Sequence, residues 1–146
     1  MNYVGKKFFC IFTVIVITIC LCACKKKEWS KNDFELSVET SNNIVTVGDE
    51  LIVTAKIKSL REKKVEIWDN GSMPFIFFYE ENAKPTFTSS TQKVTHNIYK
   101  DQPIVRTEKF SPQTPGNYII KVVADFWIDE QKIEIEFDDI FIKVKS

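Results

Sequence analysis

Apolar and polar residues alternate along most of the chain after Phe34. Between residues 50 and 58 every odd-numbered side chain is apolar, beginning with Leu51 and Val53. The same two-residue period runs through residues 117–128 and 131–137. Such alternation turns one face of a β-strand toward a core and the other toward solvent. Because no segment after Phe34 shows a 3.6-residue apolar stripe with helix caps, the pattern predicts an all-β fold.

The alternation, with the turn residues between its runs, predicts seven to nine strands. In chain order they are expected at 34–40, 50–58, 63–69, 74–80, 92–99, 104–110, 117–128 and 131–144, with a short extra piece at 44–47. Many short strands separated by turn signals are typical of an antiparallel sandwich. The sequence therefore predicts a single antiparallel β-sandwich domain over residues 33–146.

Two signals predict how the chain turns near residue 70. Asn70-Gly71 predicts a type I′ hairpin, in which both central residues have positive φ. Pro74 lacks a backbone N–H, so the strand that follows it is expected to begin there or to lie at a sheet edge.

The apolar phase changes inside the last predicted strand. Apolar side chains occupy odd positions up to Phe137 and even positions from Ile140 onward, with Asp138-Asp139 between them. A β-bulge adds one residue to one strand of a pair, which would return the apolar side chains to the core. The sequence therefore predicts a bulge or kink at Asp138–Asp139.

The first 23 residues follow a different pattern. Lys6 and Lys7 precede an apolar run of 14 residues from Phe8 to Leu21. As a helix this run would extend roughly 21 Å, short of the roughly 30 Å hydrocarbon core of a bilayer. A basic start and a short apolar run are typical of a cleaved signal peptide. The alternative is an uncleaved anchor helix that reaches Cys24, and both interpretations put the domain at a membrane surface.

The end of this run, Leu21-Cys22-Ala23-Cys24, resembles the lipobox of bacterial lipoproteins. The resemblance covers the first 24 residues. It implies cleavage before Cys24 and a diacylglycerol on the Cys24 thiol, with further acylation by palmitate or a similar chain. Two acyl chains hold a protein stably, because each buried methylene contributes about 0.8 kcal/mol. The expected organisation is a signal peptide over 1–23, a lipidated tether over 24–32, flexible from Lys25 to about Asn32, and an extracytoplasmic domain at the cell membrane.

Two other stretches resemble immunoglobulin-like domains. Residues 110–118 resemble the corner at which a Tyr at the start of a late strand hydrogen-bonds back across the turn. Residues 45–54 resemble the approach to the second strand of bacterial immunoglobulin-like domains. The resemblance implies an immunoglobulin-like β-sandwich in which Tyr118 holds the corner. The cysteine pair of antibody domains is absent, which restricts the resemblance to the bacterial relatives without that disulfide.

Charge limits the class of partner. The chain has 20 basic and 20 acidic residues with the signs interspersed, so no nucleic acid is expected as a partner. Lys25-Lys26-Lys27 is the one local run of charge. Beside a lipid anchor it would rest on anionic head groups or serve as a solvated tether.

No motif for catalysis, a metal or a cofactor is visible. His96 is the single histidine, and no nucleophile–base motif surrounds it, so a surface or cross-strand side chain is expected. Asp125 and the acidic pairs at 129–130 and 138–139 have oxygens that suit calcium, but they lack the spacing of a calcium loop. We expect them to be solvated turn and bulge residues, and we expect no enzymatic activity, no cofactor and no metal.

One predicted strand is apolar on both faces. Residues 75–79 read Phe-Ile-Phe-Phe-Tyr, and two tryptophans elsewhere fall on the polar phase of their strands. If these side chains share one sheet face, they form an exposed aromatic patch, and such patches often mark binding sites. The candidate binding patch comprises Trp68, Phe75, Phe77, Phe78, Tyr79 and Trp127. The alternative, which we favour because a large exposed patch promotes aggregation, is that the segment 81–91 folds over this face and buries it.

Three functional hypotheses follow. The first is a membrane-anchored, extracytoplasmic lipoprotein whose non-catalytic immunoglobulin-like module binds an envelope protein or acts as a spacer. The second is a proteinase inhibitor at the cell envelope with a reactive loop at 81–91 or 99–103. The third, an enzyme, has the least support because no catalytic set is visible.

Overall fold

The computed structural model of the protein describes residues 28–83, 85 and 92–146. Within them a short 3₁₀ turn, η1 (Lys31–Asp33), precedes nine strands. The strands are β1 (Phe34–Thr40), β2 (Ile44–Thr46), β3 (Leu51–Ser59), β4 (Val65–Asp69), β5 (Phe75–Glu80), β6 (Val94–Ile98), β7 (Ile104–Phe110), β8 (Gly116–Ile128) and β9 (Gln131–Lys145). Each predicted strand is present within two residues of its expected limits.

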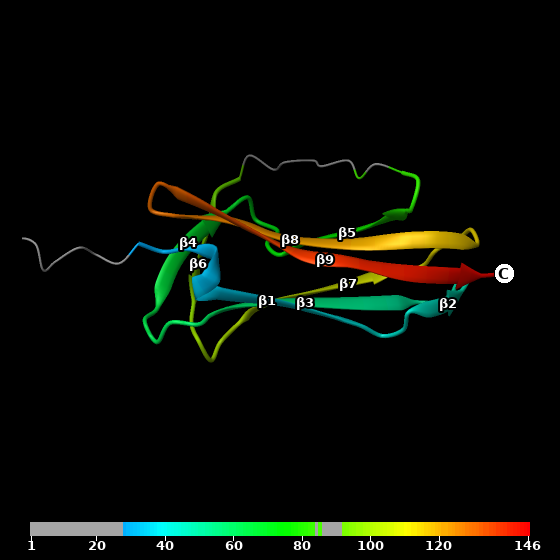
Figure 1. Ribbon diagram of the computed structural model, residues 1–146, viewed down its shortest axis with the longest axis horizontal. Helices are drawn as coiled ribbons and strands as arrows, with labels where there is room; N and C mark the ends of the chain where they lie inside the picture. Colours follow the sequence, from blue (N-terminus) through cyan, green and yellow to red (C-terminus); the bar gives the residue numbers. More distant parts are fainter. Residues whose placement is uncertain (1–27, 84, 86–91) are drawn as a thin grey trace, which may run out of the picture.

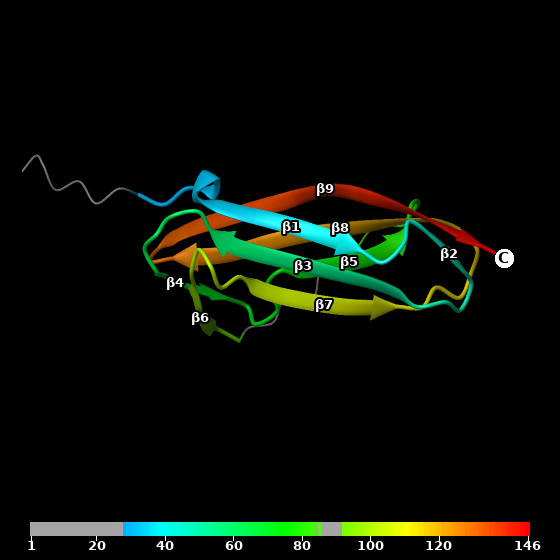
Figure 2. The same cartoon turned by 90° about the horizontal axis from the view of Figure 1, so that it is seen from below.

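The strands form two sheets packed face to face (Figure 1). The smaller sheet has the order β1-β3-β7, and the larger has the order β2-β9-β8-β4-β6, with β5 also paired to β8. Figure 2 shows the smaller sheet in front of the larger one, with β1, β3 and β7 running along the long axis. The described pairs are antiparallel except β2 with β9, which is parallel. The predicted β-sandwich is confirmed, with one parallel pair added.

The core lies between the two sheets and consists of two clusters. In one cluster Leu51 of β3 packs with Ile120 of β8, and both side chains are fully buried. The other cluster includes Phe126, whose ring meets that of Phe34 edge to face with centroids 5.0 Å apart. Full burial of one such side chain contributes roughly 1.5–3 kcal/mol. The alternation along β3 and β8 therefore supplies much of the stabilisation that joins the sheets.

The bulge predicted in the last strand is confirmed. Ile120 pairs with Ile140, whereas Val122 pairs with Phe137, so the two residues 138–139 of β9 lie opposite one residue of β8. Phe137 and Ile140 both pack against the core as a result. The extra residue thus compensates for the change of phase in the sequence.

The type I′ hairpin predicted at Asn70-Gly71 is wrong. Gly71 has a φ of 89°, but Asp129 is the one described residue other than glycine with positive φ. β4 and β5 both run antiparallel to β8 and lie one after the other along its edge, so they cannot form a hairpin with each other. Asp69 shapes the start of the loop between them, because its carboxylate accepts a hydrogen bond from the Gly71 N–H. β5 begins directly after Pro74, as predicted.

The corner before β8 has the contact that the immunoglobulin resemblance implies. The Tyr118 hydroxyl donates to the backbone oxygen of Thr114 at 3.1 Å and lies 2.7 Å from its Oγ1. The ring of Tyr118 is buried and stacks on Phe78 with centroids 4.8 Å apart. With this corner and its two sheets, the domain is an immunoglobulin-like β-sandwich.

Most of the N-terminal predictions concern residues that the structure does not describe. The signal peptide, Cys24 and Lys25–Lys27 lie outside them. Residues 28–32 differ from the flexible tether expected, because they lead into η1 and make side-chain contacts with the body of the domain. In the part of the chain that the structure describes, no helix is long and apolar enough to cross a bilayer.

Candidate binding face

The outer side of the larger sheet carries a group of aromatic side chains. β8 buries its even-numbered residues from Tyr118 to Ile128, so its odd-numbered residues point away from the core. Phe75, Phe77 and Tyr79 of β5 pair with these odd-numbered positions. Trp68 of β4 pairs with Trp127 of β8 in the same way. We call Trp68, Phe75, Phe77, Tyr79 and Trp127 the outer aromatic face, and each is half-buried.

The two tryptophans form one end of this face. Their rings stack across the β4–β8 pair, with centroids 5.1 Å apart and planes 5° from parallel. Lys93 Nζ lies 4.4 Å from the ring centroid of Trp68, within range of a cation–π contact. Trp68 Nε1 donates to the backbone oxygen of Asp129 at 3.4 Å. These contacts fix the indole rings, so a partner would meet a preformed surface.

The phenylalanines of β5 form the middle of the face. The rings of Phe75 and Phe77 stack with centroids 6.3 Å apart. Tyr79 lies across from Ile119 of β8, and Ile119 in turn pairs with Phe141 of β9. Phe141 is 63% exposed and extends the apolar surface across three strands. Phe141 was not expected in this surface from the sequence. After the bulge at 138–139 the even-numbered residues of β9 face the core, so the odd-numbered Phe141 points outward.

The assignment of Phe78 to the binding patch is wrong. Phe78 pairs with Ile120, an inward-facing residue of β8, and it packs against the core cluster there. Its ring stacks between Tyr118, at 4.8 Å, and Phe110, at 4.9 Å. The apolar run in β5 therefore has two roles, since its even positions fill the core and its odd positions form the outer aromatic face.

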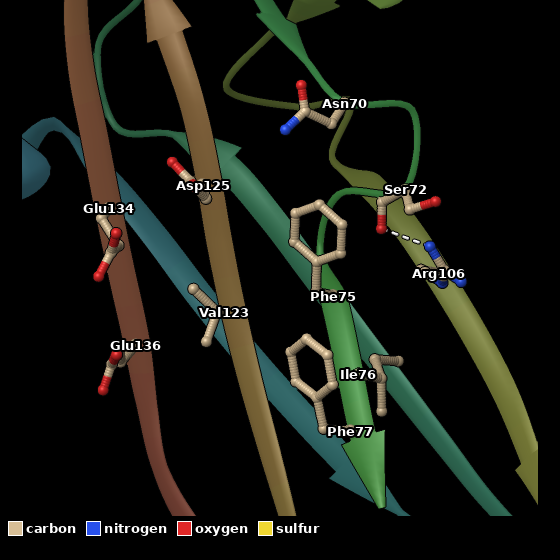
Figure 3. Close-up of a pocket in the computed structure, with 10 residues that line it drawn as sticks. All are labelled: Asn70, Ser72, Phe75, Ile76, Phe77, Arg106, Val123, Asp125, Glu134 and Glu136. Carbon is tan, nitrogen blue, oxygen red and sulfur yellow. Dashed lines mark hydrogen bonds between the residues drawn. The ribbon is translucent and has the colours of Figure 1, made fainter. Parts of the chain in front are cut away.

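A groove of about 470 Å³ opens beside Phe75 and Phe77 (Figure 3). It lies where the loop between β4 and β5 leaves the edge of β8. Phe75 and Phe77 form its aromatic side, and the carboxylates of Asp125, Glu134 and Glu136 form the opposite side (Figure 3). The groove can therefore accept a ligand that combines an apolar surface with hydrogen-bond donors.

Lysines neutralise most of the acidic side of this groove. Lys132 Nζ lies 3.1 Å from Asp125 Oδ2 and 3.0 Å from Glu134 Oε2. Hydrogen bonding to Glu134, and then to Asp125, raises the pKa of Lys132. Lys121 pairs with Glu136 at 3.1 Å, and this hydrogen bond raises the pKa of Lys121. Asp125 Oδ1 differs, because it is buried and has no hydrogen-bond partner among the described residues.

His96 contacts a buried carboxylate on the neighbouring strand. Its Nε2 lies 3.1 Å from Asp69 Oδ2, although the two atoms are not aligned as a hydrogen bond. The Asp69 side chain is fully buried, whereas that of His96 is 34% exposed. His96 is thus a cross-strand side chain, as expected, and its neighbour Asp69 already shapes the loop after β4.

The acidic residues considered for calcium occupy structural positions. Asp125 pairs with Lys132, Asp129 occupies the tight turn between β8 and β9 with a φ of 53°, and residues 138–139 form the bulge. Within residues 28–83, 85 and 92–146, no group of three or more His, Cys, Asp or Glu side chains is arranged to hold a metal ion.

Two predictions concern loops. Residues 84 and 86–91, the larger part of the segment expected to cover the aromatic face, lie outside the described residues, so that cover stays a prediction.

The loop 99–103 is tied to the domain, because the Ser59 N–H donates to the Tyr99 oxygen and Lys100 pairs with Glu62. Its role as a reactive loop of an inhibitor stays a prediction.

Comparison with known proteins gives a structural likeness only. No family model matches the chain, and no curated protein matches it. The fold is similar to the CARDB domain of a Pyrococcus furiosus protein, crystallised with di-metal ions, with 13% identity and a TM-score of 0.45 over 77% of this chain and 93% of that one. It is also similar to part of a Listeria innocua β-glucosidase in complex with isofagomine, with 15% identity and a TM-score of 0.43 over 77% of this chain. The match spans 16% of that enzyme's length.

Proposed function

We propose that the protein is a lipid-anchored, extracytoplasmic and non-catalytic binding module whose outer aromatic face holds an apolar segment of an envelope protein. The observation that carries this proposal is the side of the sheet on which the aromatic residues lie. The solvent side of an antiparallel sheet is ordinarily polar. Here five half-exposed aromatic side chains occupy it, while the core side is complete without them.

The residue types of this face suit protein recognition. Trp and Tyr are enriched among the residues that dominate binding energy at interfaces, because they present large apolar surfaces with little side-chain entropy to lose. The stacked pair of Trp68 and Trp127 and the stacked pair of Phe75 and Phe77 are already ordered against each other. Binding therefore costs little further ordering of these rings.

The groove beside the face adds a requirement for the partner. Its acidic side exposes the carboxylates of Glu134 and Glu136, and a carboxylate oxygen accepts hydrogen bonds only. A partner segment with an apolar side chain for Phe75 and Phe77 and an N–H or O–H donor for Glu134 or Glu136 fits both sides of the groove.

The anchor part of the proposal rests on the lipobox-like end of the signal segment. Acylation of Cys24 would hold the domain at the membrane and outside the cytoplasm. A module confined to the envelope meets partners of the same compartment at high local concentration, so a modest affinity is enough for occupancy.

Site-specific photo-crosslinking tests the binding face. A photoreactive residue at position 77 is expected to give a covalent adduct with one envelope protein in cells, whereas the same residue at Val105 is expected to give none. Val105 is the matched control, because it is an apolar residue of the smaller sheet and is 52% exposed. Equal adducts at both positions would contradict a specific face, and the absence of adducts at position 77 would favour a spacer.

The partner found in this way then allows a quantitative test. The double change Phe75→Ser and Phe77→Ser is expected to weaken its binding by about 30-fold or more, since two central aromatic contacts are removed. Val105→Ser is expected to leave the Kd unchanged. Circular dichroism must show both variants folded; if the double variant unfolds, the two phenylalanines are core residues and the proposal fails.

A further inference from the structure

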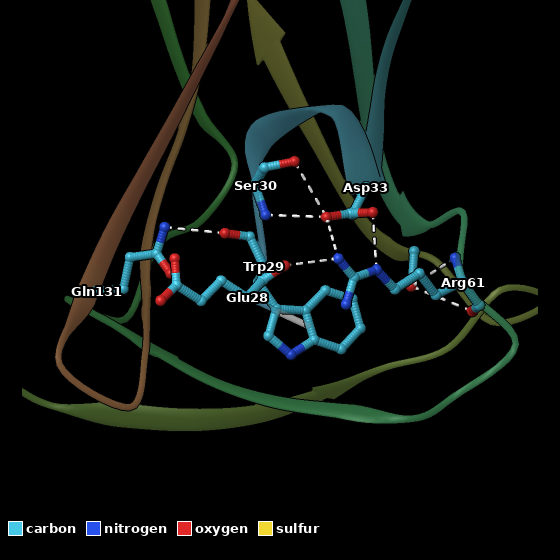
Figure 4. Close-up of polar contacts among 7 residues, drawn as sticks. Glu28, Trp29, Ser30, Asp33, Arg61 and Gln131 are labelled. Atoms are coloured by element: carbon cyan, nitrogen blue, oxygen red, sulfur yellow. Dashed lines mark hydrogen bonds and ion pairs between the residues drawn. The ribbon is translucent and has the colours of Figure 1, made fainter. Parts of the chain in front are cut away.

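The first described residues after the anchor segment are fixed to the body of the domain. Arg61, in the loop between β3 and β4, donates from Nε to Asp33 Oδ1 at 2.7 Å and from Nη2 to Asp33 Oδ2 at 2.6 Å (Figure 4). The same Nη2 donates to the backbone oxygen of Glu28 at 2.7 Å. The guanidinium carbon lies 4.1 Å from the ring centroid of Trp29, and Gln131 Nε2 donates to the Trp29 oxygen at 2.8 Å. We call these five residues the clamp.

The Arg61–Asp33 pair of the clamp is largely shielded from solvent and stays charged. The side chains of Arg61 and Asp33 are 20% and 15% exposed. The hydrogen bonds from Arg61 lower the pKa of Asp33 to about 2, so the carboxylate stays charged near neutral pH. The Trp29 ring also packs on Phe34, with centroids 5.5 Å apart. Residues 28–33 are therefore part of the domain rather than part of a free tether.

A clamped start leaves a very short connection to the anchor. Lys25, Lys26 and Lys27 alone separate Cys24 from Glu28. Fully extended, the four steps from Cys24 to Glu28 span at most roughly 14 Å. An acylated Cys24 would therefore hold the clamp end of the sandwich within that distance of the bilayer, with the C-terminal end pointing away (Figure 1).

Two exposed apolar side chains lie at the clamp end. Leu60 is 46% exposed, and its N–H donates to the backbone oxygen of Asp33 at 2.8 Å. Tyr99 is 38% exposed, and its backbone oxygen accepts from the Ser59 N–H at 3.4 Å. The backbone contacts place both residues beside the clamp, on two neighbouring loops.

Charge indicates which loop faces a bilayer. Lys63 and Lys64 are exposed and follow Leu60 in the loop between β3 and β4, and the one carboxylate of this loop, Glu62, is paired with Lys100. The nearby turn between β8 and β9 carries Asp129 and Glu130 instead. Anionic head groups attract lysines and repel carboxylates, so the lysine-bearing loop would lie closer to the lipid than that turn.

We propose that the clamp orients the domain so that Leu60 and Tyr99 rest in the lipid head-group region, with Lys63 and Lys64 against anionic head groups. This inference rests on the proposed lipid anchor at Cys24. Tyr suits this position because its ring is apolar and its hydroxyl reaches water. The surface needs little affinity of its own, because the short connection keeps it at high effective concentration beside the bilayer.

Fluorescence quenching by lipid tests the orientation. The full lipidated protein is placed in vesicles of phosphatidylcholine and phosphatidylglycerol that contain brominated lipid. A single fluorophore is attached through Leu60→Cys, Tyr99→Cys or Phe141→Cys. Phe141 is the matched control, because it is exposed and pairs with the start of β8 at the far end of the sandwich. The added cysteine is the one free thiol once Cys24 is acylated and the signal peptide is removed.

Quenching is expected to be several-fold stronger at positions 60 and 99 than at position 141. Arg61→Ala opens the clamp and is expected to reduce this difference. Equal quenching at the three positions, or stronger quenching at position 141, would overturn the orientation. Thermal unfolding of each labelled variant, with a midpoint close to that of the unlabelled protein, establishes that the label has not disturbed the fold.

Vesicle flotation and the mass of the N-terminal peptide separate the two proposals. If Cys24 carries no lipid and the protein does not float, both the anchor and the orientation fail. If Cys24 is acylated and the protein floats but positions 60 and 99 remain unquenched, the anchor stands and the orientation alone is wrong.

Discussion

At the scale of single residues, the contact of Arg61 with Asp33 is the central polar interaction of the clamp. It combines two hydrogen bonds with an ion pair, and the same guanidinium lies over Trp29. Most ion pairs of the domain are exposed, as with Lys56 and Glu39, and exposed pairs contribute little to stability. The partly buried Arg61–Asp33 pair should contribute more to stability. Removing one partner would leave the other without its hydrogen bonds and shielded from water.

The Arg61–Asp33 pair predicts an acid-dependent loss of stability. The pKa of Asp33 is lowered from 3.8 to about 2, so its contribution is fully present above about pH 5 and is lost as the pH falls from about 4 toward 2. Asp33→Asn is expected to lower the free energy of unfolding by about 1–2 kcal/mol at pH 7. Urea unfolding between pH 7 and pH 2 should show the difference from the unchanged protein shrinking below pH 4.

The exposed Glu39 supplies the control for this measurement. Glu39→Gln removes a pair with Lys56 that is open to solvent, and it is expected to change the free energy of unfolding by less than about 0.5 kcal/mol. If the difference in free energy of unfolding between Asp33→Asn and the unchanged protein stayed constant down to pH 2, the charge of Asp33 would not be the cause of its stabilising effect.

At the scale of elements, β8 and β9 organise the larger sheet. β8 pairs with β9 along nearly its whole length, and its other edge is shared by β4 and β5. The bulge in β9 is what allows the two halves of that strand to face the same core. The fold therefore needs the extra residue that the bulge adds to β9, and it does not need the carboxylates of Asp138 and Asp139.

Two variants of Asp139, a deletion and a change to Ala, test whether the extra residue or its carboxylate is needed. Deletion of Asp139 turns Ile140, Ile142 and Val144 toward the outer side, because a shift of one residue reverses every side chain of a strand. We expect the deletion to cost more than about 3 kcal/mol or to prevent folding. Asp139→Ala is expected to stay within about 0.5 kcal/mol of the unchanged protein in urea unfolding. A deletion variant as stable as Asp139→Ala would show that the strand tolerates either register.

At the scale of the whole molecule, the clamp end and the C-terminal end lie at opposite ends of the long axis (Figure 1). The outer aromatic face runs along the side between them. An anchor at the clamp end would therefore leave that face open sideways, toward proteins standing beside the domain in the envelope. The proposed anchor would therefore leave Phe75 and Phe77 accessible to such a partner.

The proposed anchor at Cys24 predicts incorporation of labelled palmitate. Label is expected in the protein made by a bacterial host and is expected to vanish in Cys24→Ala. Cys22→Ala is the control, since the resemblance assigns the acylated thiol to Cys24 alone. Label that survives Cys24→Ala, in protein recovered from the membrane fraction, would refute the assignment.

The strands were predictable from sequence because the two-residue period is a local signal, and so was the bulge, because a change of phase is visible within one strand. The partners of the strands are not local. Asn70-Gly71 indicates a turn, but only the length of β8 explains why β4 and β5 follow each other along its edge. Phe78 was misassigned because a continuous apolar run does not show which of its side chains point inward. Its inward direction follows from its pairing with Ile120. The clamp joins Trp29 to Arg61 across a long stretch of chain, and neither residue carries a signal for the other.

The in-register pairing of β1 with β3 has a mechanical consequence. The seven residue pairs from Phe34–Ser59 to Thr40–Val53 run along the long axis of the domain (Figure 2). Hydrogen bonds of an antiparallel pair lie perpendicular to the strands. A pull on the N-terminus against the opposite end of the sandwich would load these bonds together in shear instead of opening them one at a time. If the domain is anchored at Cys24 as proposed, this strand pair would resist tension applied between the two ends of the sandwich.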